Sequence, residues 1–268
     1  MLLSERSKMV YIFRVEQKRA FKKITTAFDG NKYATTKLEN QLPVRVKKHQ
    51  SVLIRKLGNS NIELQYNKVV NLKLAAEKIN GVIITPGETF SFWRLVGKTS
   101  KKKGYKEGMC LSMGEVKTGV GGGLCQLSNL IYWMVLHSPL TVTERYRHSF
   151  DPFPDNGRVL PFASGATVFY NYVDLKFINS TPYTFQINIS FDNKYIKGEI
   201  RADKELEESY HVFERNHRFI EGDGKYYREN EIWRTVLDKN TGNKIREEML
   251  IKNHCEVKYK LDMDNDKI

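Results

Sequence analysis

The feature that most constrains this chain is a glycine cluster that runs directly into a cysteine and an apolar segment. Four of the five residues from Gly119 to Gly123 are glycine, and glycine backbones adopt positive φ and approach neighbouring groups closely. Apolar residues then recur at spacings of three and four, which predicts a helix with one buried stripe. Those residues are Leu124, Leu127, Leu130, Ile131 and Met134. Cys125 is therefore expected in the first turn of that helix.

The position of Cys125 at a helix start predicts an activated thiol. Unpaired N–H groups and the positive end of the helix dipole favour the thiolate there. His148 follows a β-branched, alternating run at residues 141–146, and Asp174 lies on a later strand candidate. A cysteine, a histidine and an acid in this order can form an activated nucleophile. We predict Cys125 as the nucleophile, His148 as its base and Asp174 as the third residue, with Asp151 competing for that last role.

The residues around Cys125 would bind the substrate under this hypothesis. Backbone N–H groups near Cys125 and the side-chain amide of Gln126 are expected to stabilise the oxyanion of a carbonyl substrate. A structural interpretation stays open, because a cysteine on an amphipathic helix is commonly a small buried hydrophobe and a glycine turn can serve close packing alone. The expected substrate-contacting residues are Gly121, Gly122, Gly123, Gln126, Ser128 and Asp151.

Five motifs carry a family resemblance. They are GGGLCQLSNL at 121–130, NLKLAA at 71–76, ITPGETFSFWR at 84–94, VDLKFIN at 173–179 and YYRENEIWR at 226–234. Together they resemble the VanW family, named for an accessory protein of B-type vancomycin-resistance clusters. The resemblance implies association with glycopeptide resistance and cell-wall precursors, and no particular reaction. Many relatives have an acid where this chain has Ser164-Gly165, so the third catalytic role stays open.

Composition places the chain among globular proteins. Its 268 residues, 40% hydrophobic and 12% aromatic, suffice for one large domain or a domain with an appendage. The sequence has neither a run of 18 apolar residues nor a signal-peptide core near its N-terminus, so we expect a cytoplasmic protein. Its three cysteines lack Cys-x-x-Cys spacing, and we expect no disulfide framework, metal site or cofactor. Whether Cys110 approaches Cys125 stays open.

Positive charge is concentrated near the N-terminus. The net charge is +13, and residues 1–56 hold 14 Lys or Arg against four acids. Residues 7–28 predict a basic amphipathic helix, which either docks on its own domain or lies on the inner face of a membrane. An anionic small molecule, such as a diphosphate-linked wall precursor, fits this charge, and so does a merely solvated surface. No helix-turn-helix, zinc-finger or RNP pattern is present, so nucleic acid is not an expected partner.

The remaining patterns predict an α+β fold with an antiparallel sheet and a buried helix that carries Cys125. Asn71 is the expected N-cap of a helix over 72–79. Strands are expected at 44–46, 51–55, 166–170, 174–178, 185–191, 195–201, 209–220, 225–237, 244–251 and 256–261. We divide the chain into a basic N-terminal helix over residues 1–30, an α+β domain over 31–203, and a β-hairpin extension over 204–268.

Two functions follow from these patterns. The first is an accessory of glycopeptide resistance with a thiol-dependent amide or ester hydrolase or transferase activity on a peptidoglycan precursor, carried by Cys125. The second is a non-catalytic binding or scaffold protein that recognises an anionic lipid- or nucleotide-linked precursor through its basic face, with Cys125 buried and inert. The environment of the thiol distinguishes the two.

Overall fold

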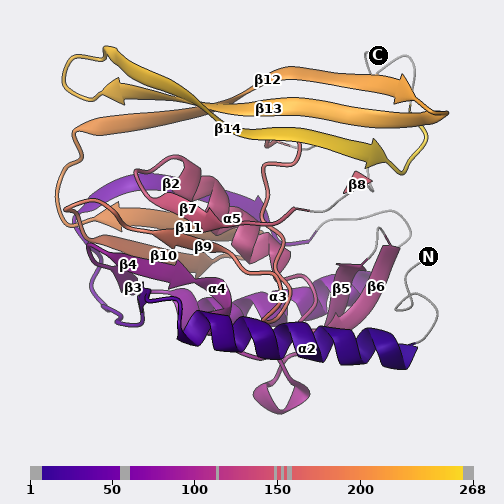
Figure 1. Ribbon diagram of the computed structural model, residues 1–268. Coiled ribbons are helices and arrows are strands. Elements are labelled where there is room, and N and C mark those ends of the chain that lie inside the picture. Colours follow the sequence, from indigo (N-terminus) through magenta and orange to yellow (C-terminus); the bar gives the residue numbers. More distant parts are fainter. Residues whose placement is uncertain are drawn as a thin grey trace.

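The chain folds around one apolar helix, α5 (Cys125–Leu136), which carries the predicted cysteine as its first residue. This computed structural model describes residues 8–54, 61–112, 115–147, 150–151, 154–155 and 159–261. Most of α5 is fully buried, because its side chains are apolar almost all round. The helix lies between a four-stranded sheet and a layer of three long C-terminal strands (Figure 1).

The four-stranded sheet under α5 has only antiparallel neighbours. Its order is β2 (Val44–Val52), β11 (Tyr195–Ala202), β10 (Phe185–Phe191) and β3 (Val82–Ile84). Alternate residues of β11 are buried, so one face of the sheet meets the core. Gly198 on that face admits α5, because a Cβ there would lie 2.6 Å from Met134 Cε. The predicted strands at 44–46 and 51–55 are one strand, β2, through residue 52.

Helix α3 (Ile62–Ile79) packs on the same sheet and is longer than the sequence predicted. It begins after Asn61, whose side chain accepts a hydrogen bond from the Glu63 N–H at 2.9 Å. The prediction of Asn71 as an N-cap was wrong, since Asn71 lies inside the helix and is fully buried. The first turns of α3 are polar, so the apolar pattern did not indicate where the helix begins. Asn71 is buried because its side chain forms hydrogen bonds across the core.

A second sheet and a hairpin complete the central domain. The sheet order is β1 (Lys32–Tyr33), β4 (Glu88–Ser91), β9 (Lys176–Ile178) and β7 (Thr141–Glu144). The hairpin of β5 (Glu107–Ser112) and β6 (Glu115–Val120), which the sequence did not predict, leads into the glycine cluster. The short helices α4 (Phe92–Val96) and η1 (Lys101–Lys103) lie between β4 and β5 in the chain. The predicted strand at 166–170 was wrong, because only isolated bridges form there, Tyr146 with Thr167 and Phe169 with Val173.

The C-terminal extension is a three-stranded meander. It consists of β12 (Glu208–Gly222), β13 (Lys225–Asp238) and β14 (Lys244–Val257), with β8 (Phe150–Asp151) added in parallel to β14. The separate strands predicted at 244–251 and 256–261 were wrong, since β14 pairs with β13 through a bulge without ending. Arg234 on β13 donates to the carbonyl of Ser138 just after α5 at 3.0 Å, so the meander covers this helix. The α+β fold class is confirmed.

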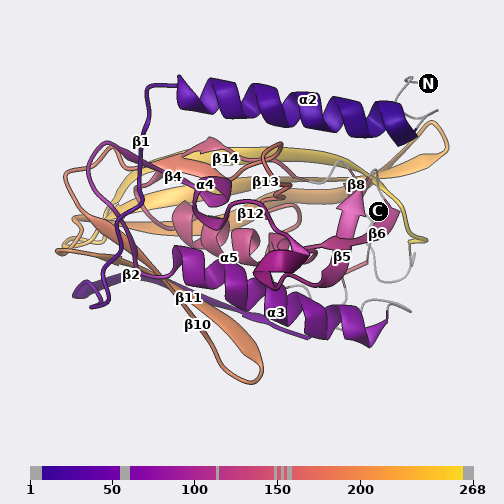
Figure 2. The same ribbon diagram turned by 90° about the horizontal axis from the view of Figure 1, so that it is seen from below.

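The predicted basic helix near the N-terminus is confirmed as α2 (Lys8–Ala27). It lies along the outside of the molecule, on the side away from the meander (Figures 1 and 2). Lys22 bonds both carboxylate oxygens of Glu144 on β7 at 2.6 Å, so the helix docks on its own domain. Among the described residues, no helix is both long and apolar enough to span a membrane.

Candidate functional site

The glycine turn before Cys125 is built for close packing. Gly121 and Gly123 have φ of 82° and 91°, a region that side-chain-bearing residues rarely adopt. A Cβ on Gly108 would lie 2.6 Å from the Gly122 carbonyl oxygen, and a Cβ on Gly122 would overlap the Gly108 carbonyl. A Cβ on Gly123 would overlap the side chain of Lys68 on α3. These glycines therefore let the turn approach the β5 hairpin and α3, which accounts for their positions without a ligand.

Asn71 holds this turn in place from the middle of α3. Its Oδ1 accepts from the Lys106 N–H at 2.8 Å, and its Nδ2 donates to the carbonyls of Lys106 and Gly122, both at 3.0 Å. The Gly121 N–H also donates to the Lys106 carbonyl at 2.9 Å. Sequence reasoning missed this role of Asn71. The signal that could have revealed it is a lone polar residue on the apolar face of a helix pattern.

Cys125 is partly buried, and its thiol is held in the neutral form. The Sγ lies 3.7 Å from the Val168 carbonyl oxygen, to which the thiol donates. Burial raises the pKa of Cys125, while backbone groups of Val168 and of Cys125 itself oppose that rise. The sequence predicted a thiolate at this helix start. Loss of hydration in the core outweighs the helix terminus here, so the thiol stays protonated at neutral pH.

A second thiol lies near the first. Cys110 on β5 is partly buried, and both cysteines are free. Burial raises the pKa of Cys110 to about 11, and the nearby charge of an ionised Cys125 raises it as well. Both thiols are weak nucleophiles in these surroundings, because the thiolate is the reactive form.

The polar side chains that follow Cys125 bind the fold itself. Gln126 Nε2 donates to Ser51 Oγ at 2.9 Å and to the Val52 carbonyl at 2.7 Å, so both hydrogens of the amide expected at the oxyanion are engaged with β2. Ser128 Oγ donates to the Ala166 carbonyl at 2.6 Å and is fully buried. Gln126 and Ser128 therefore anchor α5 to β2 and to the segment that carries Val168.

Asp174 and Asp151, the two candidates for the third catalytic role, lie in separate places. His148 lies outside the described residues. Asp174 is buried and accepts from Ser91 Oγ at 2.6 Å and from the Trp93 N–H at 3.0 Å, which secures the first turn of α4. Burial raises the pKa of Asp174, and these two hydrogen bonds oppose the rise. Asp151 is buried beneath the meander, where its Oδ2 accepts from the Tyr259 hydroxyl at 3.1 Å.

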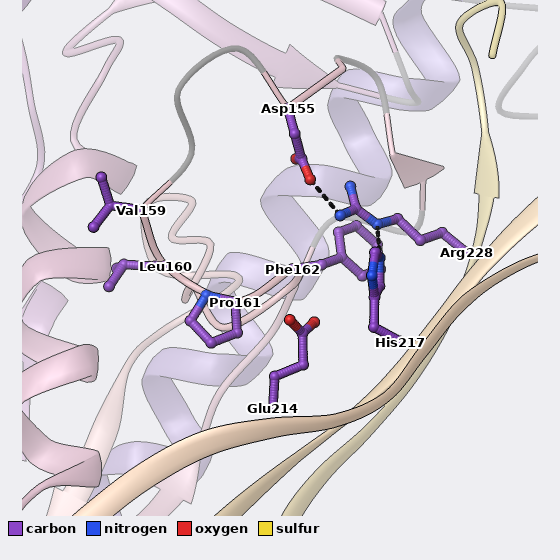
Figure 3. Close-up of a pocket in the computed structure, with 8 residues that line it drawn as sticks. All are labelled: Asp155, Val159, Leu160, Pro161, Phe162, Glu214, His217 and Arg228. Atoms are coloured by element: carbon purple, nitrogen blue, oxygen red, sulfur yellow. Dashed lines mark hydrogen bonds and ion pairs between the residues drawn. The ribbon is translucent and has the colours of Figure 1, made fainter. Parts of the chain in front are cut away.

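A cavity of about 280 Å³ lies between the segment around residue 160 and the meander, and Asp151 is bonded to Arg228 in its wall without lining it (Figure 3). The buried guanidinium of Arg228 stands in its wall and donates to Asp155, to Asp151 at 3.2 Å and to His217 Nε2 at 2.7 Å. Because an Arg only donates, that nitrogen of His217 must be the unprotonated one. The residues that line the cavity are Asp155, Val159, Leu160, Pro161, Phe162, Glu214, His217 and Arg228. Cys125 is not among them.

The positive charge in the wall of this cavity is paired with carboxylates of the protein itself. Arg228 meets two carboxylates, and its Cζ lies 4.4 Å from the centre of the Phe162 ring. Glu214 accepts from Asn230 and directs its carboxylate between Pro161 and His217 (Figure 3). Among the described residues, no group of three or more His, Cys, Asp or Glu side chains is placed to hold a metal ion. The cavity therefore offers hydrogen-bond acceptors beside an apolar wall.

Comparison with known proteins identifies the family. A sequence model described as VanW like protein matches residues 67–201, which contain Asn71, the glycine turn and Cys125. The chain is 37% identical over 234 residues to the vancomycin B-type resistance protein VanW of Enterococcus faecalis, covering 87% of this chain and 85% of that protein. The chain belongs to the VanW family. The resemblance predicted from the sequence motifs is thus confirmed.

The chain is also similar to the uncharacterized protein YoaR of Bacillus subtilis. It is 36% identical over 110 residues, which is 41% of this chain and 34% of that protein. No solved structure matches the chain. The fold of this VanW family chain is therefore described from its own residues alone.

Proposed function

We propose that this protein is an accessory protein of glycopeptide resistance that acts on or near peptidoglycan precursors. The support is membership of the VanW family together with the similarity to the Enterococcus relative, a vancomycin B-type resistance protein that aligns with 87% of this chain. That extent includes most of the framework around α5, so a shared role is a reasonable inference from a shared framework.

The protein acts, in this proposal, by binding rather than by thiol chemistry. The observation that carries it is the state of Cys125, whose pKa is raised by burial. The neighbouring side chains of Gln126 and Ser128 are engaged in holding α5 to the rest of the core. A protonated thiol is a weak nucleophile, and the side-chain donors of Gln126 and Ser128 that could stabilise an oxyanion are already engaged.

The candidate binding site of this mode is the cavity beside Arg228. Its volume of about 280 Å³ suits a single side chain or sugar substituent of a larger ligand. Glu214 supplies an acceptor in its wall, and Phe162 and Pro161 supply apolar surface. A nucleotide-linked muramyl peptide is a suitable soluble probe, and Glu214→Gln should weaken its binding in a calorimetric titration while leaving the unfolding temperature unchanged.

A thiol-dependent amide or ester hydrolase or transferase is the second candidate. It is favoured by the position of Cys125 as the first residue of α5, where its own backbone group already opposes the effect of burial on the pKa. In that mechanism the Cys125 sulfur attacks a carbonyl carbon, the thiol proton passes to His148, and His148 returns it to the leaving group. This route requires both a base and water at the Cys125 sulfur.

Replacement of Cys125 separates the two candidates. The variants Cys125→Ala and Cys125→Ser should keep glycopeptide resistance, measured as the inhibitory concentration of vancomycin in a host that depends on this protein. Cys110→Ala is the matched control, because it removes a neighbouring, partly buried thiol that has no catalytic assignment. Loss of resistance in both Cys125 variants, at unchanged protein level and unfolding temperature, would instead establish thiol chemistry.

A further inference from the structure

Helix α2 docks on the domain through its polar side and leaves its apolar side in solvent. The half-buried residues that face the domain are Val15, Arg19, Lys22 and Thr26. The large apolar residues are exposed instead, with Phe13 at 63% and Phe21 at 69% of their free surface. Among the side chains that the structure describes here, the exposed large apolar ones are Met9, Val10, Ile12, Phe13, Phe21 and Ile24 on the helix and Phe28 just after it. A surface helix of a globular domain ordinarily has the opposite orientation.

Five of the exposed residues form one continuous stripe. At 100° per residue, Val10, Phe13, Phe21, Ile24 and Phe28 fall within an arc of about 80° on the helix surface. The residues that contact the domain occupy the opposite side. Scattered exposed apolar residues are normal on a protein surface, but a contiguous stripe of this kind marks an interaction site.

Specific contacts fix this orientation. Lys22 bonds the Glu144 carboxylate at 2.6 Å, and Glu144 also meets the buried Lys176 at 3.5 Å. Arg19 donates from Nε to the Tyr170 carbonyl at 3.3 Å, and its own carbonyl accepts from Asn171 Nδ2 at 2.9 Å. Rotating the helix to bury its phenylalanines would break the contacts of Lys22, of Arg19 and of the Arg19 carbonyl, and would leave Glu144 with Lys176 as its cation.

Basic side chains border the stripe. Helix α2 carries six Lys or Arg residues and one acid, Glu16, which Arg19 already pairs. On the helical wheel Arg14 lies along one side of the stripe and Lys23 along the other. Lys18 lies beyond Arg14 and donates to the Tyr172 hydroxyl of the domain at 2.9 Å. Two copies of this helix placed stripe to stripe would bring these like charges together, which disfavours a second copy of the chain as the partner.

We infer that the outer face of α2 docks on a membrane surface that contains anionic phospholipids. The phenylalanines and Ile24 enter the boundary between headgroups and acyl chains, and Arg14 and Lys23 meet the headgroup phosphates. An apolar stripe bordered by basic residues on a helix parallel to the surface is the arrangement that such an interface requires. This inference does not depend on Cys125 or on the cavity at Arg228.

Vesicle flotation of the full chain tests the inference. Wild type should float with vesicles of phosphatidylcholine containing about one third phosphatidylglycerol, and much less with phosphatidylcholine alone. The triple variant Phe13→Ser, Phe21→Ser and Ile24→Ser should lose at least about tenfold in partitioning, because binding scales with buried apolar area. Arg14→Gln and Lys23→Gln should each lose about fivefold on the anionic vesicles only. The matched control is Ile245→Ser with Met249→Ser, two half-exposed apolar residues on β14.

Two results would overturn the inference. One is equal flotation of wild type and the triple variant at equal unfolding temperature. The other is absence of wild-type flotation together with a dimer, detected by light scattering, that the triple variant abolishes, since the stripe would then join two copies. Because the substituted side chains are exposed, the variants should fold as wild type does, and circular dichroism checks this.

Discussion

Asn71 is the residue whose removal most directly tests how the fold positions Cys125. It sits fully buried in α3 and bonds the backbone of Lys106 and Gly122 from one side chain. Replacement by alanine removes three hydrogen bonds at once. The Lys106 carbonyl keeps the bond from the Gly121 N–H, whereas the Lys106 N–H and the Gly122 carbonyl lose the amide that they bond.

The expected loss follows from these two groups. A buried backbone group deprived of its hydrogen bond costs about 1–3 kcal/mol, so Asn71→Ala should lower the free energy of unfolding by about 3 kcal/mol. For a chain of this size that corresponds to a fall of roughly 6–12 °C in the unfolding temperature. The glycine turn should also open locally, which hydrogen exchange at the Lys106 N–H reports as faster exchange than in wild type.

Asn71→Asp adds a pH signature. Its carboxylate can still accept from the Lys106 N–H, but its other oxygen would face the carbonyls of Lys106 and Gly122, to which Asn71 now donates. The folded state therefore holds the proton more tightly than the unfolded chain does, and the pKa of the introduced acid rises above about 3.9. Stability then falls as the pH rises from about 4 through the folded pKa, so the penalty is complete at neutral pH.

Denaturant unfolding at several pH values is the appropriate assay. At pH 7 Asn71→Asp should be less stable than Asn71→Ala, and the difference should close as the pH approaches 4. Comparing the two variants cancels the pH dependence of the rest of the protein. If Asn71→Ala unfolds at the wild-type denaturant concentration, or exchange at Lys106 is unchanged, then Asn71 does not hold the turn and the reasoning is refuted.

Three further predictions concern other parts of the fold. Gly122→Ala should lower the free energy of unfolding by about 3 kcal/mol, because its Cβ would overlap the Gly108 backbone. Gly30→Ala, with open space around it, should lower it by about 1 kcal/mol through backbone strain alone. Thermal unfolding of both variants distinguishes packing from strain. Arg228→Met should lower stability by about 3–5 kcal/mol because it strips the guanidinium from the buried Asp151, and adding Asp151→Asn should restore part of the loss; an unchanged Arg228→Met protein would contradict the buried pair. Burial lowers the pKa of His137 to about 4, below its unfolded value of about 6.5. The unfolded chain therefore takes up the proton first, and the free energy of unfolding falls as the pH drops from about 6.5 to 4. In His137→Gln, denaturant unfolding at several pH values should show a smaller fall across that interval.

Local patterns were sufficient for much of the fold. The apolar spacing after the glycines predicted α5, and the turn residues near 221–224 and 238–242 predicted the boundaries of the meander strands. These succeeded because helical period and turn chemistry are encoded within a few neighbouring residues. The start of α3 was predicted wrongly because its first turns are polar and lack an apolar pattern. The strand at 166–170 was predicted wrongly because only isolated bridges form there, one of them with the distant Tyr146.

The sequence by itself determined the family, the helix that begins at Cys125 and the basic amphipathic character of α2. Only the tertiary structure decided what those features face. Burial in the core sets the pKa of Cys125, contacts with Lys106 and Gly122 give Asn71 its role, and the ion pair with Glu144 turns the apolar side of α2 outward. The physical reason is that a periodic pattern specifies a face, whereas the partner of that face is set by segments far away in the chain.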